Sequence, residues 1–164
     1  MNIDLTQLIV RKVTENDIDT MIFHRVNYLT EMQGERDSAT IEKLRTELSL
    51  YFRQGIANGS FTALVAEYNS KVVSYGAIVL HTVPGDFNCS SYLEGDILNM
   101  YTVPEARKQG VSTVVLKQLI SEAKSLGLTK LALHTSVAGE KLYRSAGFNN
   151  PIFPYLELVI NYSI

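Results

Sequence analysis

The sequence predicts a mixed α/β (α+β) fold with the element order β-α-α-β-β-β-α-β-α-β. Three observations predict it. Short runs alternate apolar and polar residues, which is typical of half-buried strands, whereas longer segments repeat apolar residues at helical spacing. Turn-forming residues separate these segments, and no internal repeat or linker is visible. A length of 164 residues fits one domain over residues 1–164.

The first part of the chain predicts one strand and two helices. Residues 8–13 alternate as a half-buried strand does. Thr14 can then cap a helix that runs to about residue 29, with acidic residues in its first turn. A polar break at residues 33–37 precedes a second helix from Ser38 to about residue 54. The apolar positions of these two helices are Met21, Ile22, Val26 and Leu29, then Ile41, Leu44, Leu48 and Tyr51.

A hairpin and a further strand follow. Phe61–Tyr68 and Lys71–Val83 are rich in β-forming residues and meet at Asn69-Ser70, which predicts an antiparallel hairpin. The polar stretch Pro84–Ser91 is a loop, and Tyr92–Val103 is the next strand.

The second half predicts two helices and two strands. A glycine turn near residue 110 opens an amphipathic helix that ends at Gly127, in the position of a helix-terminating glycine. Residues 129–135 form a strand, residues 138–146 a helix ended by Gly147, and residues 155–162 a last strand. The apolar stripe of the first of these helices is Val111, Val114, Val115, Leu119, Ile120 and Ala123.

Composition excludes several classes of function. A net charge of -2 and a pI near 5.9 argue against a nucleic-acid partner, which would need clustered Lys and Arg. The single cysteine, Cys89, cannot form an internal disulfide. No apolar run approaches the roughly 20 residues that span a bilayer, and the N-terminus shows no secretory signal. The sequence therefore predicts a cytoplasmic protein without membrane or nucleic-acid partners.

Residues 97–148 carry the most informative pattern of the chain. A strand-like run breaks at Pro104 into a glycine-bearing turn that opens a helix. The first N–H groups of a helix have no intrahelical partner, and the helix dipole favours negative charge there. The pattern predicts a site for a phosphate-bearing ligand.

This segment resembles motifs A and B of the GNAT superfamily, the acyl-CoA-dependent N-acetyltransferases. The family pattern Arg/Gln-x-x-Gly-x-Gly/Ala reads here Arg107-x-x-Gly110-x-Ser112, with serine in place of the last small residue. The resemblance implies a GNAT fold whose mixed central sheet is splayed between two parallel strands, here residues 97–103 and 129–135. It also implies acetyl-CoA as the acyl donor and no metal.

The resemblance assigns cofactor contacts to two stretches. The turn would hold the pyrophosphate through Arg107, Lys108, Gln109, Gly110, Val111, Ser112 and Thr113. The strand would pair with the pantetheine arm through the backbone of Met100, Tyr101, Thr102 and Val103. A β-bulge near Asn99-Met100 would aim an N–H at the thioester oxygen, and Ser136 stands where the family often has an asparagine that contacts the cofactor.

Tyr143 is the residue to which the resemblance assigns acid catalysis. Residues 142–148 match the family motif Leu-Tyr-x-x-x-Gly-Phe, whose tyrosine protonates the leaving thiolate. A tyrosine that packs the helix onto the sheet is the structural alternative.

Glu94 and Asp96 are the candidates for the general base. Alternation places both on one face of the strand that precedes the turn, where GNAT members with a carboxylate base often carry it. The alternatives are a solvated acidic strand end, or a patch that binds a cationic substrate without taking its proton. His24 and His81 are candidates for lining a substrate pocket, whereas His134 is a structural candidate. No His/Cys cluster has metal-ligand spacing.

Two classes of function remain from the sequence. The first is an acetyl-CoA-dependent N-acetyltransferase that transfers acetyl to a primary amine of a small molecule or peptide by direct attack in a ternary complex. The second is a GNAT-fold acyl-CoA-binding or regulatory module without turnover. Because family members often pair, a homodimer that contributes residues across the pocket is also open.

Overall fold

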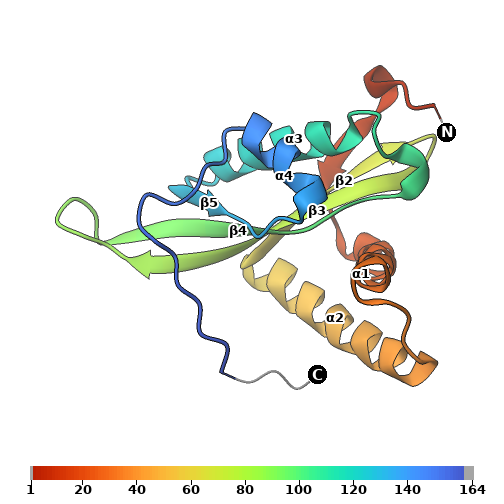
Figure 1. Ribbon diagram of the computed structural model, residues 1–164, viewed down its shortest axis with the longest axis horizontal. Helices are drawn as coiled ribbons and strands as arrows, with labels where there is room; N and C mark the ends of the chain where they lie inside the picture. The colour runs from red at the N-terminus through yellow and green to blue at the C-terminus, as the bar shows by residue number, and fades with distance from the viewer. Residues whose placement is uncertain (1, 161–164) are drawn as a thin grey trace. The chain divides into compact units, whose positions relative to one another are not determined.

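The computed structural model describes residues 2–160, and within them a five-stranded sheet is accompanied by four helices (Figure 1). The strand order is β1-β2-β3-β4-β5; β4 and β5 are parallel and the other pairs are antiparallel. The strands are β1 (Ile9–Lys12), β2 (Phe61–Tyr68), β3 (Lys71–Pro84), β4 (Ser91–Thr102) and β5 (Lys130–Ala132). The helices are α1 (Ile18–Gln33), α2 (Ser38–Asn58), α3 (Val111–Ser125) and α4 (Val137–Ser145).

The chain divides into two compact units, Met1–His134 and Thr135–Ile164. The first unit contains the sheet and α1, α2 and α3, and the second contains α4 and the segment that follows it. The mixed α/β fold class is confirmed, whereas a single domain over residues 1–164 stays a prediction.

In the first unit the sheet lies between two layers of helices, α3 on one face and α1 with α2 on the other (Figure 1). The core under α1 and α2 includes Met21, Phe52, Tyr75 and Ala77, all of them buried. On the opposite face Val115 and Leu119 of α3 are fully buried against the sheet. Both faces of the sheet are therefore covered over much of its area, which stabilises the strands that carry the candidate site.

The predicted hairpin is confirmed. β2 and β3 pair from Phe61↔Val79 to Tyr68↔Lys71. Asn69 and Ser70 both have positive φ, of 50° and 60°, as the two central residues of a type I′ turn require.

All four predicted helices are present, and the first two extend further toward their C-terminal ends than predicted, whereas α3 and α4 end within two residues of the predicted position. A 3-10 turn at Glu15–Asp17 precedes α1, which therefore begins at Ile18 and not directly after Thr14. α1 reaches Gln33 and α2 reaches Asn58, where Gly59 adopts a left-handed conformation and ends the helix. Tyr51, predicted on the buried side of α2, is 45% exposed, and the neighbouring Phe52 is fully buried instead. A shift of one position on a helix turns a side chain by about 100°, so the ring without a hydroxyl, that of Phe52, takes the buried position.

Two strand predictions are wrong in extent or in kind. β5 covers Lys130–Ala132 and not residues 129–135, because its pairing with β4 stops at Asp96↔Ala132. In the predicted last strand, residues 155–160 are irregular, and residues 161–162 lie outside the described residues. Leu156, Leu158 and Ile160 are each more than 80% exposed, since no strand pairs with this alternating segment among residues 2–160.

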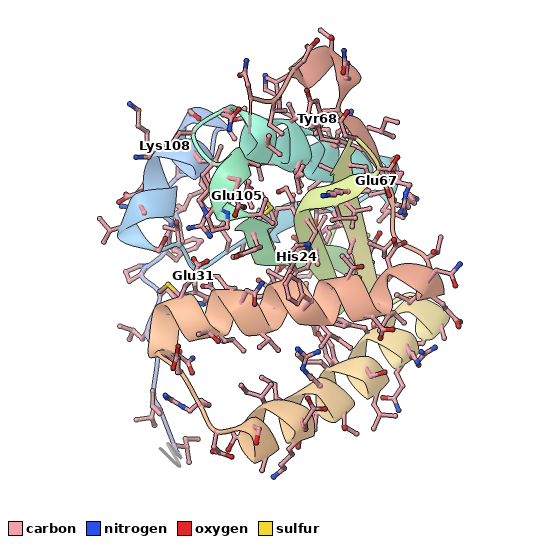
Figure 2. The ribbon with its side chains drawn as sticks, turned by 90° about the vertical axis from the view of Figure 1, so that its right-hand side faces the viewer. His24, Glu31, Glu67, Tyr68, Glu105 and Lys108 are labelled. Carbon is pink, nitrogen blue, oxygen red and sulfur yellow. The ribbon has the colours of Figure 1, made fainter. Side chains whose placement is uncertain are left out.

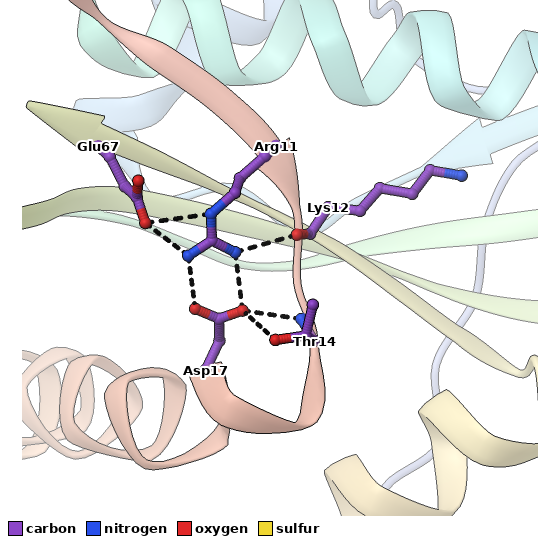
Figure 3. A network of polar contacts seen from close by, with 5 residues as sticks. All are labelled: Arg11, Lys12, Thr14, Asp17 and Glu67. Carbon is purple, nitrogen blue, oxygen red and sulfur yellow. Dashed lines mark hydrogen bonds and ion pairs between the residues drawn. The ribbon is translucent and has the colours of Figure 1, made fainter. Parts of the chain in front are cut away.

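Arg11 on β1 forms hydrogen bonds to β2 and to the start of the first helical region (Figure 3). Its guanidinium donates to both carboxylate oxygens of Asp17 at 2.8 Å and to Glu67 at 2.5 and 3.1 Å. Thr14 and Asp17 form a capping box, in which the Thr14 amide donates to Asp17 Oδ2 at 2.7 Å. The hydrogen bonds from Arg11 lower the pKa of Asp17 to about 2.

Candidate functional site

β4 carries the predicted β-bulge. The pairs Tyr75↔Tyr101 and Ala77↔Leu98 flank a shift of register, so that Asn99 and Met100 together oppose Gly76. Asn99 has a φ of 61°, a left-handed conformation that asparagine tolerates better than most residues. A Cβ on Gly76 would come within 2.3 Å of Met100 Sδ and 2.7 Å of Leu119 Cδ1, so any larger residue opposite the bulge would displace these two side chains.

The parallel pairing of β4 and β5 is short, so a gap beside β4 arises from the end of β5. β4 and β5 pair at three positions, Glu94↔Lys130, Gly95↔Leu131 and Asp96↔Ala132. β5 ends there, whereas β4 continues to Thr102. Beyond Asp96, β4 therefore has an edge toward β5 that no strand covers among residues 2–160. Such an edge offers unpaired N–H and C=O groups to an extended ligand.

Alternation of the peptide groups decides which residues face this open edge. The Val103 amide donates to Val73 O at 2.9 Å, so Val103 and, two residues earlier, Tyr101 direct their peptide groups toward β3. The peptide groups of Met100 and Thr102 then face the open edge. Arg107 Nε donates to Thr102 O at 2.8 Å, which is consistent with that direction and already satisfies one acceptor.

The turn after β4 leads into α3, whose first amides have no acceptor within the helix. Lys108 and Gly110 both adopt left-handed conformations, with φ of 59° and 85°. Gly110 is the N-cap of α3 and supplies no side-chain cap, and the Val114 amide donates to Gly110 O at 3.2 Å. The amides of Val111, Ser112 and Thr113 precede that bond and have no acceptor within the helix. This end of α3 has the donors that bind phosphate oxygens in other proteins.

The N-terminal segment supports the same turn. Gln109 Oε1 accepts from the Ile3 amide at 2.7 Å, and Gln109 Nε2 donates to Glu105 O at 2.8 Å. A Cβ on Gly110 would lie 3.1 Å from Leu5 Cδ1. Glycine at position 110 is thus favoured by its positive φ, and a Cβ there would also require Leu5 to shift slightly, in addition to any approach of a phosphate.

A cluster on the α1 side fixes Arg107. Its Nη2 donates to both carboxylate oxygens of Glu31 at 2.8 Å, and its guanidinium lies 5.3 Å from the centroid of the Tyr101 ring. Tyr101 Oη donates to Glu31 Oε1 at 3.0 Å. Burial acts to raise the pKa of Glu31, but the hydrogen bonds from Arg107 and Tyr101 outweigh it and hold the pKa below its ordinary value. Figure 2 shows Glu31 on α1 and Lys108 at the turn.

The candidate bases lie in an acidic cluster near the other end of β4. Glu94 contacts the Lys130 ammonium and lies 3.7 Å from His81 Nε2, measured at Glu94 Oε2. Asp96 Oδ2 lies 3.5 Å from His81 Nδ1. Strand register brings these groups together, since His81 pairs with Glu94 across the hairpin and Glu94 pairs with Lys130 across the parallel strands.

This cluster lies on the sheet face that α1 and α2 cover. Asp96 pairs with Val79, and Leu98 pairs with Ala77, both of which pack with that core. Side chains that pair across strands share a face, so Glu94 and Asp96 point to the α1 and α2 side. Leu98, the next residue on this face, is 41% exposed, which leaves the surface between the cluster and the bulge accessible.

The second unit contains the other two predicted site residues. Ser136 is the N-cap of α4, and its Oγ accepts from the Gly139 amide at 3.3 Å. At the other end the Gly147 and Phe148 amides donate to Arg144 O and Tyr143 O, which is a Schellman motif. The Tyr143 and Phe148 rings pack edge to face at 5.9 Å. The Leu-Tyr-x-x-x-Gly-Phe motif therefore has a structural role as a helix terminator, beside the catalytic role that the resemblance assigns to Tyr143.

Two residues of these clusters were not predicted with the roles that their contacts suggest. Glu31 lies in a stretch of polar residues at the end of α1, and nothing in the sequence connects it with Arg107, 76 positions away. His81 was predicted only as a candidate pocket residue. Counting residues along the β3–β4 hairpin would have paired it with Glu94, had the loop length been known.

Of the remaining candidates, His24 packs against the Tyr101 ring of the Arg107 cluster, and Cys89 joins neither cluster. His24 is buried, with its ring 5.8 Å from that of Tyr75 and 5.5 Å from that of Tyr101, and burial lowers its pKa. Cys89 is exposed in the loop between β3 and β4. Within residues 2–160, no group of three or more His, Cys, Asp or Glu side chains could hold a metal ion, and no helix there could cross a membrane.

The chain matches the model of the acetyltransferase (GNAT) family over residues 27–148. It is 32% identical over 107 residues to a protein from Azospirillum brasilense named IAA acetyltransferase. That match covers 62% of this chain and 65% of the length of the relative.

Solved structures agree. A predicted acetyltransferase from Clostridium acetobutylicum, solved with acetyl-CoA, is 30% identical and has a TM-score of 0.79, with 93% of this chain and 96% of that chain covered. A GCN5-related N-acetyltransferase from Ralstonia eutropha shares the fold at 19% identity and a TM-score of 0.75, with 92% and 98% covered. The chain belongs to the GNAT acetyltransferase family.

Proposed function

We propose that this protein is an acetyl-CoA-dependent N-acetyltransferase that transfers acetyl to a primary amine by direct attack in a ternary complex. One observation carries the proposal: the bulged, open edge of β4 leads directly into the donor-rich start of α3. An extended arm that carries a pyrophosphate fits this combination, because the edge offers strand-like pairing and the helix start offers anion binding. The related protein from Clostridium acetobutylicum, solved with acetyl-CoA, supports the same cosubstrate.

The same geometry supports a set of residues that hold the cosubstrate. The peptide groups of Met100 and Thr102 pair with the pantetheine arm, and the amides of Val111, Ser112 and Thr113 receive pyrophosphate oxygens. An amide at the Asn99-Met100 bulge donates to the thioester carbonyl oxygen and stabilises the negative charge that develops there. Acetyl-CoA supplies the activated acyl group.

Proton transfers on either side of the attack are made by side chains. An alkylammonium has an ordinary pKa near 10.4, so it must lose a proton before its lone pair can attack the carbonyl carbon. The acidic cluster at Glu94 and Asp96 accepts that proton. As the nitrogen–carbon bond forms and the carbon–sulfur bond breaks, Tyr143 donates a proton to the departing thiolate, whose conjugate acid has a pKa around 8.5.

The acceptor is a cationic amine in this proposal. Glu94 and Asp96 lie on the same face as the exposed Leu98, and they give that surface two carboxylates. Negative charge at the mouth of a site attracts a cationic substrate and favours it over an anionic one. A polyamine, an amino sugar and a peptide amino group all satisfy this requirement.

A test separates the enzyme from a binding module without turnover. The purified protein is incubated with acetyl-CoA and a panel of amines, and release of free thiol is measured beside the thermal shift that acetyl-CoA produces. Thiol release that depends on both an amine and the protein supports the proposal. A clear thermal shift without thiol release across the panel would favour the module, and the absence of both would exclude the cosubstrate.

A further inference from the structure

His81 occupies a central position in the acidic cluster. It lies on β3, where it pairs directly with Glu94, and Asp96 pairs with Val79 two positions away. Side chains at direct and diagonal positions on one face of a sheet lie within reach of each other. Each imidazole nitrogen faces a different carboxylate, Nδ1 facing Asp96 at 3.5 Å and Nε2 facing Glu94 at 3.7 Å.

The two carboxylates have different surroundings. The Glu94 side chain is only 14% exposed and contacts the Lys130 ammonium. Glu94 and Lys130 are also directly opposite each other in the parallel pairing of β4 and β5. The Asp96 side chain is 47% exposed, and its carboxylate lies 3.5 Å from the imidazole of His81, which is itself 40% exposed. Glu94 is therefore enclosed and charge-compensated by a lysine, whereas Asp96 and His81 share the solvent-facing side of the cluster.

We propose that His81 and Asp96 form the proton-accepting pair for the acceptor amine, with Glu94 as a structural anchor through Lys130. This inference rests on the proposed function. It replaces the two carboxylates as the general base by the His81 imidazole, which Asp96 positions. A neutral imidazole has one N–H donor and one basic nitrogen, so it can donate to a carboxylate through one nitrogen while the other accepts a proton from the amine.

The proton balance of the step is simple. Nδ1–H of the neutral imidazole points to Asp96, and Nε2 takes one proton from the alkylammonium. The freed nitrogen lone pair then attacks the thioester carbonyl carbon, and the imidazolium is stabilised by Asp96 on one side and Glu94 on the other. The distances of 3.5 and 3.7 Å exceed ordinary hydrogen-bond lengths, so the ring is not locked to either carboxylate before an amine binds.

Two strands on one side of β3 contribute the charged groups of this cluster. β4 contributes Glu94 and Asp96, and β5 contributes Lys130, which acts through its contact with Glu94. Removal of either carboxylate changes the electrostatic field at His81, so variants of His81, Asp96 and Glu94 should differ in a predictable order. Loss of His81 removes the proton acceptor, loss of the Asp96 charge removes its orienting partner, and loss of the Glu94 charge chiefly disturbs Lys130.

The experiment compares pH–rate profiles of kcat/KM for the wild type, His81→Gln, Asp96→Asn and Glu94→Gln with an amine found in the panel. His81→Gln should lower kcat/KM about 100-fold and abolish the acidic limb. Asp96→Asn should lower it about 10-fold and displace the limb, and Glu94→Gln should keep the limb in place with a less than 5-fold loss. Thr82→Val changes a residue on the same strand whose side chain lies on the opposite face of the sheet, so it serves as the control for substitution in this part of β3.

Each outcome decides one question. Calorimetry with acetyl-CoA and a melting curve first establish that each variant folds and still binds the cosubstrate. Wild-type turnover with an unaltered acidic limb in His81→Gln would overturn this inference and leave the proposed function standing. Loss of the limb in Glu94→Gln alone would make Glu94 the base and also overturn it. Absence of wild-type turnover would overturn the proposed function, and this inference with it.

Discussion

The two ends of β4 build their sites from different parts of the chain. At the C-terminal end, the bulge, the open edge and the turn into α3 present mainly backbone groups, all within residues 99–113. At the N-terminal end, side chains from three strands converge on His81. Backbone donors suit a ligand whose phosphates are the same for every reaction, and converging side chains suit the proton chemistry of one acceptor. Changes at the first end should alter cosubstrate affinity, and changes at the second should alter rate.

The largest expected effect on rate comes from Tyr143, the side chain proposed to donate a proton to the departing thiolate. Tyr143→Phe removes only a hydroxyl, so kcat should fall on the order of 100-fold while acetyl-CoA affinity stays within about 2-fold. Steady-state kinetics beside calorimetry measures both. The Phe148 contact persists with phenylalanine, which makes this variant its own control for packing. Wild-type kcat would mean that water or another group protonates the thiolate.

The second prediction concerns the turn after β4, where a substitution should lower cosubstrate affinity and leave kcat nearly unchanged. Gly110→Val disfavours the φ of 85° and crowds Leu5, so the turn changes shape and its amides lose their direction. CoA affinity should fall about 10-fold or more, and kcat at saturating cosubstrate should change little. Gly127→Val is the matched control, since Gly127 has a φ of 76° at the far end of α3. Equal losses of CoA affinity in both variants would break the comparison.

A smaller effect is expected where a side chain only tunes the backbone site. Glu31→Gln removes a carboxylate that holds Arg107 beside the open edge. With less negative charge there, affinity for the anionic CoA should rise about 3-fold at low salt and return toward the wild-type value as salt screens the charge. Arg107→Gln should shift affinity the opposite way. Calorimetry at two ionic strengths distinguishes this from a salt-independent loss of structure.

The Arg11–Asp17 network should affect stability alone. The pKa of Asp17 is about 2 in the folded protein against an ordinary value of 3.8, so its charge stabilises the fold above about pH 4. That stabilisation, about 2 kcal/mol, is lost as the pH falls from about 4 to about 2. Asp17→Asn should lower the free energy of unfolding by a similar amount at pH 7 and remove this pH dependence, as urea melts can show. A change in CoA affinity or kcat would contradict the separation of the regions.

The same contrast explains what the sequence could predict. The turn at Arg107–Ser112 and the helix that follows it are contiguous in the chain. Gly127 and Gly147 each lie just beyond the helix that they end, so local backbone preferences encode these features directly. The bulge was predicted from the resemblance and is present, with Gly76 opposite it and Asn99 left-handed.

The convergence of His81 with Glu94, Asp96 and Lys130 depends on registers across three strands, and an error of one residue in the loop would turn His81 to the other face. The ion pair of Glu31 and Arg107 depends on where α1 packs, which no local pattern encodes. The irregular segment at 155–160 has the alternation of a strand, and alternation alone does not supply a partner edge.

Amide hydrogen exchange with and without CoA tests the central claim most directly. The claim predicts that CoA slows exchange at Met100 and Thr102, which face the open edge, and at Val111, Ser112 and Thr113 at the start of α3. Tyr101 and Val103, whose peptide groups face β3, should be protected already and should change little. New protection confined to other parts of the chain, or equal gains at all four residues from 100 to 103, would contradict a cosubstrate site built on this edge.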